Sequence, residues 1–115
     1  MQNDPNLGLN YAWEFGESGW NVGMDANLLK LGSIVQLSVL SDNLINPPSS
    51  PTIGDRHIIA DGAIDVWINH GRRIALWIDG SWQIYVPKDG WLCWIISRKT
   101  LAVFDEEEWK DLLSL

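Results

Sequence analysis

Short runs of apolar residues, separated by turn residues, fill the second half of this chain. The apolar segment 74–78 is followed by Asp79-Gly80, a dipeptide that tolerates the positive φ angles of a tight hairpin turn. One strand in about every 8–12 residues is typical of an antiparallel β fold. The pattern predicts a mainly β protein, a small antiparallel β-sandwich or barrel of short hairpins. The expected strands lie at 56–60, 66–69, 74–78, 82–86, 91–97 and 101–104.

The first residues of the chain have a different pattern. Residues 1–10 show no periodicity and contain Pro and Gly, so we expect an extended N-terminal arm, which we place at 1–20. Met24, Leu28 and Leu31 recur at helical spacing and would share one face of a helix. This spacing predicts a short N-terminal helix at about 24–32.

Two segments join this helix to the strands. Residues 34–39 alternate between apolar and polar side chains, which predicts a strand with Val35 on its apolar side. Residues 46–53 contain three prolines, which lack backbone donors, so we expect an irregular connector there. The patterns together predict an arm at 1–20 and a single β-rich domain at 21–115.

A tryptophan-rich stretch, 75–95, holds four of the eight tryptophans. Such rings can fill a core, form a seam between identical subunits, or stack on sugar rings. Because Trp82 and Trp109 follow turns, we expect these two rings to be the most exposed. The candidate residues for a subunit interface or a glycan-stacking platform are Trp77, Trp82, Tyr85, Trp91, Trp94 and Trp109.

Two predicted strands, 74–78 and 91–96, carry apolar side chains on both faces. A strand of this kind is normally covered on both faces. In a chain of 115 residues the core can provide one cover. The second cover would come from the N-terminal helix, another subunit or a ligand, so the pattern predicts an interaction surface.

A weak repeat relates ALWIDGSW at 75–82 to AVFDEEEW at 102–109. Each copy has a small residue, two apolar residues, an acidic turn and a closing tryptophan. The repeat predicts two similar hairpins, and the acidic run 105–108 is expected to form a solvated turn.

The composition narrows the classes of partner. The formal net charge is −7, so the chain repels phosphate backbones and we expect no nucleic-acid binding. No apolar run reaches the roughly 18 residues that cross a bilayer, so no membrane insertion is expected. The sequence has no secretory-signal pattern. Cys93 is the single cysteine, which excludes an intrachain disulfide.

No sequence pattern predicts catalysis, a cofactor site or a metal site. His57 and His70 are the only histidines, and they form no spaced ligand set with Cys93. No Gly-x-Ser-x-Gly elbow is present. Neighbouring carboxylates such as Asp61 and Asp65 lie beside turns, where acidic residues are common. We therefore expect a protein that is not an enzyme, with no catalytic residue, no cofactor and no metal.

Several motifs follow one another along the chain. They are Asn27-Leu28 followed by VQLSV at 35–39, then GDR at 54–56, WIDGSW at 77–82 and PKDGW at 87–91. In this order they resemble an uncharacterised domain family of tailed bacteriophages, prophages and gene transfer agents, found among tail, fibre and host-specificity genes. The chain departs from that family at His57, where tyrosine is usual, and at 106–108, where a glycine-containing turn is usual.

The resemblance implies a virion structural protein, made in the bacterial cytoplasm, that serves as an adaptor or base of a tail or head fibre or spike. Phage fibres are commonly trimers, so it implies a homotrimer that contacts other phage structural proteins of the fibre, baseplate or capsid. The chain stops soon after the motifs, which favours a stand-alone adaptor or a short fibre base. The alternative is a carbohydrate-binding module for host surface glycans. The residues expected to dock the arm on its partner are Tyr11, Trp13, Phe15 and Trp20.

Overall fold

The computed structural model describes residues 1–115 and divides them into two compact units, Met1–Val35 and Gln36–Leu115. The N-terminal unit contains β1 (Gln2–Asn3), β2 (Asn10–Tyr11) and α1 (Trp20–Ile34). The strands of the C-terminal unit are β3 (Ser38–Val39), β4 (Arg56–Ile58), β5 (Ile74–Ile78), β6 (Ser81–Tyr85), β7 (Leu92–Ile95), β8 (Thr100–Asp105) and β9 (Glu108–Ser114). Its two short 3₁₀ helices are η1 (Asp65–Trp67) and η2 (Ile96–Arg98). The mainly β class with one helix is confirmed.

The N-terminal arm is not simply extended. Strands β1 and β2 form a small antiparallel hairpin, and the hairpin is tied to α1 by Asn27. The Asn10 backbone N–H donates to Asn27 Oδ1 at 2.7 Å, and Asn27 Nδ2 donates back to the Asn10 carbonyl at 2.8 Å. The arm and α1 therefore belong to the same compact unit, Met1–Val35.

Helix α1 is longer than the sequence pattern predicts. It begins directly after Gly19, whose φ of 82° suits glycine, and it continues to Ile34. Within it, a Cβ atom added to Gly23 would lie only 2.6 Å from Trp13 Cζ2, so the Trp13 ring requires glycine at this helix position. Val35 ends the helix and is exposed, so the expected strand at 34–39 is reduced to β3.

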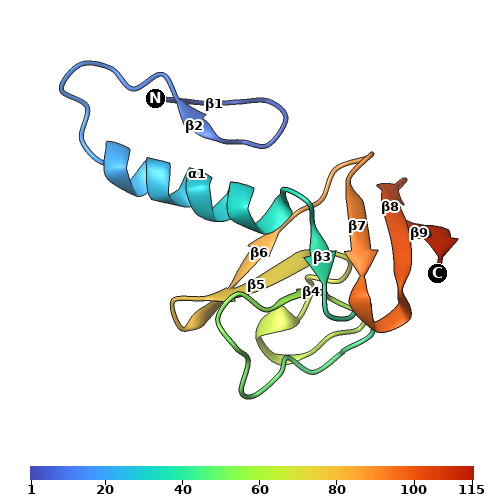
Figure 1. Ribbon diagram of the computed structural model, residues 1–115. Helices are drawn as coiled ribbons and strands as arrows, with labels where there is room; N and C mark the ends of the chain where they lie inside the picture. Colours follow the sequence, from blue (N-terminus) through green and yellow to red (C-terminus); the bar gives the residue numbers. More distant parts are fainter. The chain divides into compact units, whose positions relative to one another are not determined.

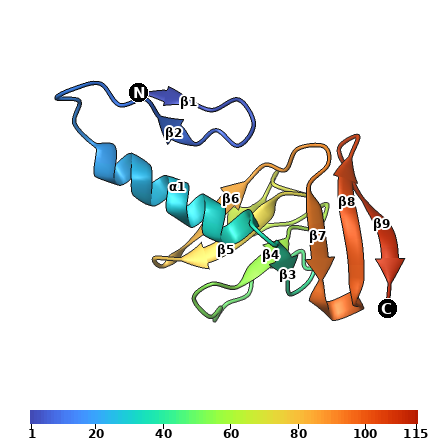
Figure 2. The same cartoon turned by 45° about the horizontal axis from the view of Figure 1, so that its top comes forward.

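The C-terminal unit contains two sheets. One has the strand order β4-β5-β6 and is antiparallel, and the other has the order β3-β7-β8-β9. Figure 2 shows β7, β8 and β9 side by side, and Figure 1 shows β5 and β6 as a separate hairpin. Because β3 pairs with β7 in parallel, the second sheet is mixed rather than purely antiparallel. Neither sheet closes into a barrel.

The two sheets of this unit share one hydrophobic core. Sheet β3-β7-β8-β9 provides Val39, Cys93, Ile95 and Ala102, and each of these side chains is almost completely buried. Sheet β4-β5-β6 faces them with Ile58 and Ile74, together with Leu37 from the segment before β3. The arrangement is that of a small sandwich, because the inner faces of two sheets supply one core.

The two copies of the sequence repeat form two hairpins. In β5–β6, Trp77 pairs with Trp82, and in β8–β9, Phe104 pairs with Trp109. The two ring centroids are 5.1 Å apart in each pair. The prediction of two similar hairpins is confirmed, and the acidic turn joins β8 to β9.

The segment 66–69 is not a strand, and this prediction is wrong. The chain forms η1 there, beginning at Asp65 with φ of 55°, and Trp67 turns into the protein with no exposed surface. Burial of one large ring therefore decides the conformation of this segment over its apolar pattern. Strand β9 is the second strand of the hairpin that the repeat predicts, and it continues past Trp109 to Ser114.

Candidate functional site

Strand β5 is covered on both faces by its own chain. One face, with Ile74, lies in the core shared by the two sheets. The opposite face, with Ala75, packs against a second cluster that contains Ile59, Ala63 and Trp67. The expectation that its second cover comes from a helix, subunit or ligand is therefore wrong for this strand. Residues between β4 and β5 provide the cover.

Strand β7 has one face buried and one face open. Cys93 and Ile95 have no exposed surface, whereas Leu92, on the opposite face of β7, is 53 % exposed. Strand pairing continues the open face across the sheet, because Leu92 lies opposite Val103, Trp94 opposite Leu101, and Leu101 opposite Leu113. We call these five residues the outer apolar face: Leu92, Trp94, Leu101, Val103 and Leu113.

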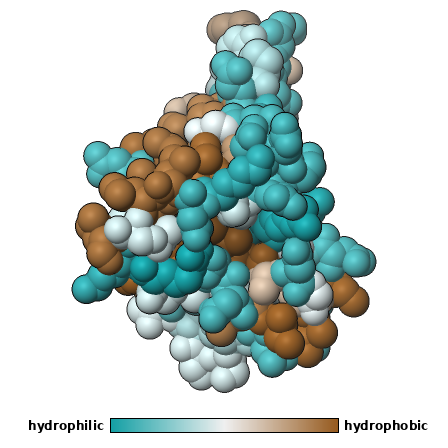
Figure 3. Space-filling model, turned by 90° about the vertical axis from the view of Figure 1, so that its right-hand side faces the viewer, coloured by the Kyte–Doolittle hydropathy of each residue, from teal (hydrophilic) through white to brown (hydrophobic).

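Polar pairs border the outer apolar face on both sides. On the β3 side, Trp94 lies opposite Ser38, whose hydroxyl accepts a hydrogen bond of 3.1 Å from Arg56. On the β9 side, Val103 lies opposite Lys110, whose amine contacts Asp105 at 3.1 Å. Figure 3, which views the side that carries β8 and β9, shows apolar surface divided by hydrophilic strips. An apolar centre with a polar rim is the usual anatomy of a protein interface.

An aromatic cluster lies on the other sheet. The Trp82 ring meets the rings of Trp67 and Trp77 edge to face, each at 5.1 Å between centroids, and His57 at 5.9 Å. His57 is buried, and its Nδ1 lies 2.8 Å from the Ser41 hydroxyl. Burial lowers the pKa of His57, and the nearby Asp55 carboxylate only partly opposes this. These rings pack against one another and do not form a flat platform.

The remaining aromatic candidates are half-buried. Tyr85, Trp91 and Trp109 pack against the core between the sheets. The indole N–H of Trp109 donates a 2.8 Å hydrogen bond to the Arg72 carbonyl, which fixes the ring. Neither Trp82 nor Trp109 is among the exposed large side chains, so the expectation that these rings are the most exposed is wrong.

The aromatic residues expected to dock the arm all lie in the N-terminal unit. Tyr11, Phe15 and Trp20 are exposed there, whereas Trp13 is half-buried against Gly23. The structure therefore presents three of the four rings to solvent.

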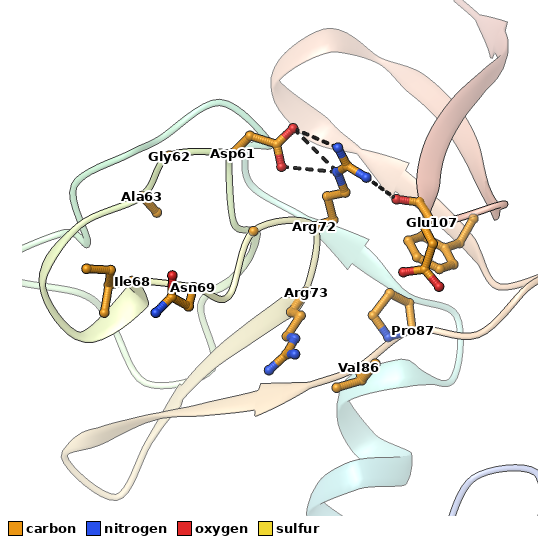
Figure 4. A pocket seen from close by; sticks show the side chains of 12 residues that line it. Asp61, Gly62, Ala63, Ile68, Asn69, Arg72, Arg73, Val86, Pro87 and Glu107 are labelled. Atoms are coloured by element: carbon orange, nitrogen blue, oxygen red, sulfur yellow. Dashed lines mark hydrogen bonds and ion pairs between the residues drawn. The ribbon is translucent and has the colours of Figure 1, made fainter.

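Sequence reasoning missed a pocket of about 510 Å³ in the C-terminal unit. Figure 4 shows Arg72 at its edge, between Asp61 and the backbone of Glu107. Arg72 Nε donates to Asp61 Oδ1 at 3.1 Å, and Nη1 donates to the Glu107 carbonyl at 2.7 Å. Adjacent arginines in a negatively charged chain, directly after a turn, were the signal that could have indicated this site.

Other chemistry is limited by burial and spacing. Burial raises the pKa of the Cys93 thiol to about 12, so the group stays protonated and unreactive in the folded state. No three side chains of His, Cys, Asp or Glu lie close enough to hold a metal ion. No helix has the length and apolarity that crossing a membrane would require.

Comparison with known proteins identifies a family without assigning a function. A search of curated proteins finds no match to this chain. Residues 24–110 match a family described as protein of unknown function, DUF2793. The matched segment extends from α1 into β9. It includes the whole pocket and every residue of the outer apolar face except Leu113. Because the match includes most of its length, the chain belongs to the DUF2793 family.

Proposed function

We propose that this chain is a non-catalytic structural component of a bacteriophage virion, an adaptor or base of a tail or head fibre or spike. In this proposal it is made in the bacterial cytoplasm and assembles as a homotrimer through the outer apolar face. The motif resemblance to phage and gene-transfer-agent proteins supports the virion location. The open apolar surface supports the assembly.

The observation that carries the proposal is the open side of β7. Leu92 and Leu113 are 53 % and 57 % exposed, and both belong to one continuous set of paired apolar residues. Single exposed apolar residues are ordinary, but a contiguous set with a polar rim is typical of an interaction site. Trp94 is the largest side chain of this face, and tryptophan is enriched among the interface residues that contribute most of the binding energy.

The N-terminal unit supplies the second contact in this proposal. Tyr11, Phe15 and Trp20 are exposed, and aromatic rings of this kind are enriched at protein interfaces. Their partner would be another phage structural protein of the fibre, baseplate or capsid. The glycan-stacking alternative gains less support, because Trp82 and Trp109 are held in packed clusters.

The test is the solution mass of the full chain by light scattering across a range of concentrations. We expect a trimer that Leu92→Ser converts to smaller species, because a hydroxymethyl group replaces an apolar contact at the interface. Ile53→Ser is the matched control, since Ile53 is 75 % exposed and lies outside this face. A monomer at every concentration, or a trimer that Leu92→Ser leaves intact, would contradict assembly through the outer apolar face.

A further inference from the structure

The pocket beside Arg72 is built on unusual backbone. Asn69, Arg72 and Glu107 line it and have positive φ angles of 64°, 71° and 65°. Such conformations are costly for residues with a Cβ atom and often accompany ligand sites. At Gly71, an added Cβ would lie 2.9 Å from Asp61 Oδ1. The loop is therefore packed closely enough to hold its polar groups in one arrangement.

The charged groups of this pocket balance one another. Asp61 and Glu107 supply two carboxylates, and Arg72 and Arg73 supply two guanidinium groups, so the formal charges sum to zero. Arg72 donates hydrogen bonds to the Asp61 carboxylate and to the Glu107 carbonyl. Arg73 instead donates from Nη1 to His70 Nδ1 at 2.9 Å and has no carboxylate partner. A cation and a carboxylate that are not paired with each other thus face one pocket.

Several polar atoms in the pocket retain hydrogen-bonding capacity. The Glu107 carboxylate accepts no hydrogen bond within the protein, and the Asn69 side chain makes none. Arg73 retains donors beyond its contact with His70, since a guanidinium has five N–H groups. Figure 4 shows the Arg73 side chain between Asn69 and Pro87. The pocket therefore presents an acceptor, a cationic donor and an amide with both functions.

Apolar side chains complete the lining. Ile68, Val86, Pro87 and Phe104 belong to the same pocket as the charged groups. The volume of about 510 Å³ falls within the range of small-molecule sites, about 300–1,000 Å³. The accessible lining is nevertheless more polar than apolar, which suits a ligand that has many hydrogen-bonding groups.

We infer that this pocket binds a neutral saccharide. Sugar hydroxyls donate to a carboxylate and accept from a guanidinium, so one ring can satisfy both Glu107 and Arg73. The C–H face of the same ring can lie against the apolar wall formed by Val86 and Pro87. An anionic ligand would meet the Glu107 carboxylate, and a cationic ligand would meet Arg73. The balanced charges thus favour an uncharged polyhydroxyl ligand over either.

The inference is tested by NMR titration of the isotope-labelled full chain. The probes are glucose, galactose, mannose and N-acetylglucosamine, each up to tens of millimolar, with glucuronate and glucosamine as charged analogues. We expect saturable shifts from at least one neutral sugar at the backbone amides of 68–73 and of Val86. The charged analogues should bind more weakly than their neutral counterpart.

Two variants and a matched control locate the binding. Glu107→Gln and Arg73→Met should each weaken binding about tenfold, because each removes a charge-assisted hydrogen bond. Glu106→Gln should leave affinity unchanged, since Glu106 shares the same turn but does not line the pocket. Absence of saturable shifts with every neutral sugar would overturn the inference. Tighter binding of glucuronate than of glucose, or equal effects of Glu106→Gln and Glu107→Gln, would overturn it too.

Discussion

The two sheets of the C-terminal unit differ in how their apolar residues are covered. Strand β5 is central in sheet β4-β5-β6 and is covered on both faces within the chain. Strand β7 lies inside sheet β3-β7-β8-β9 and is covered on one face only. Both strands are apolar at every position. The same pattern of residues therefore leads to a closed core in one sheet and an open face in the other.

The lengths of the connections explain this difference. Residues 59–73 join β4 to β5, and this segment can fold back and place Trp67 on the sheet. Residues 96–99 join β7 to β8, and most of them form η2, so too little chain remains to cover a sheet face. An apolar strand face thus indicates burial only where a neighbouring segment is long enough to reach it. Otherwise the face stays open, as it does on β7.

The largest expected loss of stability is for a substitution in the segment that packs on β5. Trp67→Ala should lower the free energy of unfolding by about 3–5 kcal/mol, because it opens a cavity beside Ala75. The Trp67 indole N–H has no hydrogen-bond partner, so the loss comes from ring packing. Urea unfolding measures the change. A loss below about 1 kcal/mol would mean that the loop does not cover this sheet as described.

Trp94→Ala is the matching change on the open face of β7. In dilute solution it should cost less folding free energy than Trp67→Ala, because the Trp94 ring is only half-buried. Trimer association should weaken by about 2 kcal/mol or more, because tryptophan residues are enriched among the contacts that contribute most to binding. Unfolding and sedimentation of the same variant separate these effects. A folding loss equal to that of Trp67→Ala would remove the distinction between the two faces.

Substitutions in the two hairpin turns should change the free energy of unfolding by smaller amounts, with opposite signs in the two turns. Gly80 has φ of 75° in the β5–β6 turn, and Glu107 has φ of 65° in the β8–β9 turn. Gly80→Ala should lower the free energy of unfolding by about 1 kcal/mol, because a Cβ atom is disfavoured there. Glu107→Gly should raise it by about 0.5 kcal/mol for the same reason. Equal signs for these changes, measured by thermal unfolding, would contradict this account of the turns.

The smallest effect concerns pH and the buried His57. Burial lowers its pKa in the folded state, so the unfolded state binds a proton first as the pH falls. The stability that neutral His57 contributes is fully present above about pH 6.5 and is lost as the pH falls through the lower folded-state pKa. Urea midpoints between about pH 7.5 and pH 5.5 should fall more for the native chain than for His57→Gln. Equal pH dependence in both proteins would exclude His57 as the cause.

Local chemistry made the hairpins of the C-terminal unit predictable. Asp79-Gly80 predicts the β5–β6 turn, and the repeat predicts a second hairpin in which Trp109 closes the pair. The segment 66–69 was mistaken for a strand because its pattern does not reveal that Trp67 is buried by tertiary packing. The pocket was missed because Asp61, Arg72 and Glu107 come from distant parts of the chain.

The sequence by itself determined the β-rich class, the two similar hairpins and the excess of apolar strand faces over a single core. These features depend on side-chain alternation and turn residues, which act between near neighbours. Only the tertiary structure decided which face of each strand is covered and which charged groups share a pocket. Both depend on how far each connection reaches and on which residues it brings together, and no local pattern encodes that outcome.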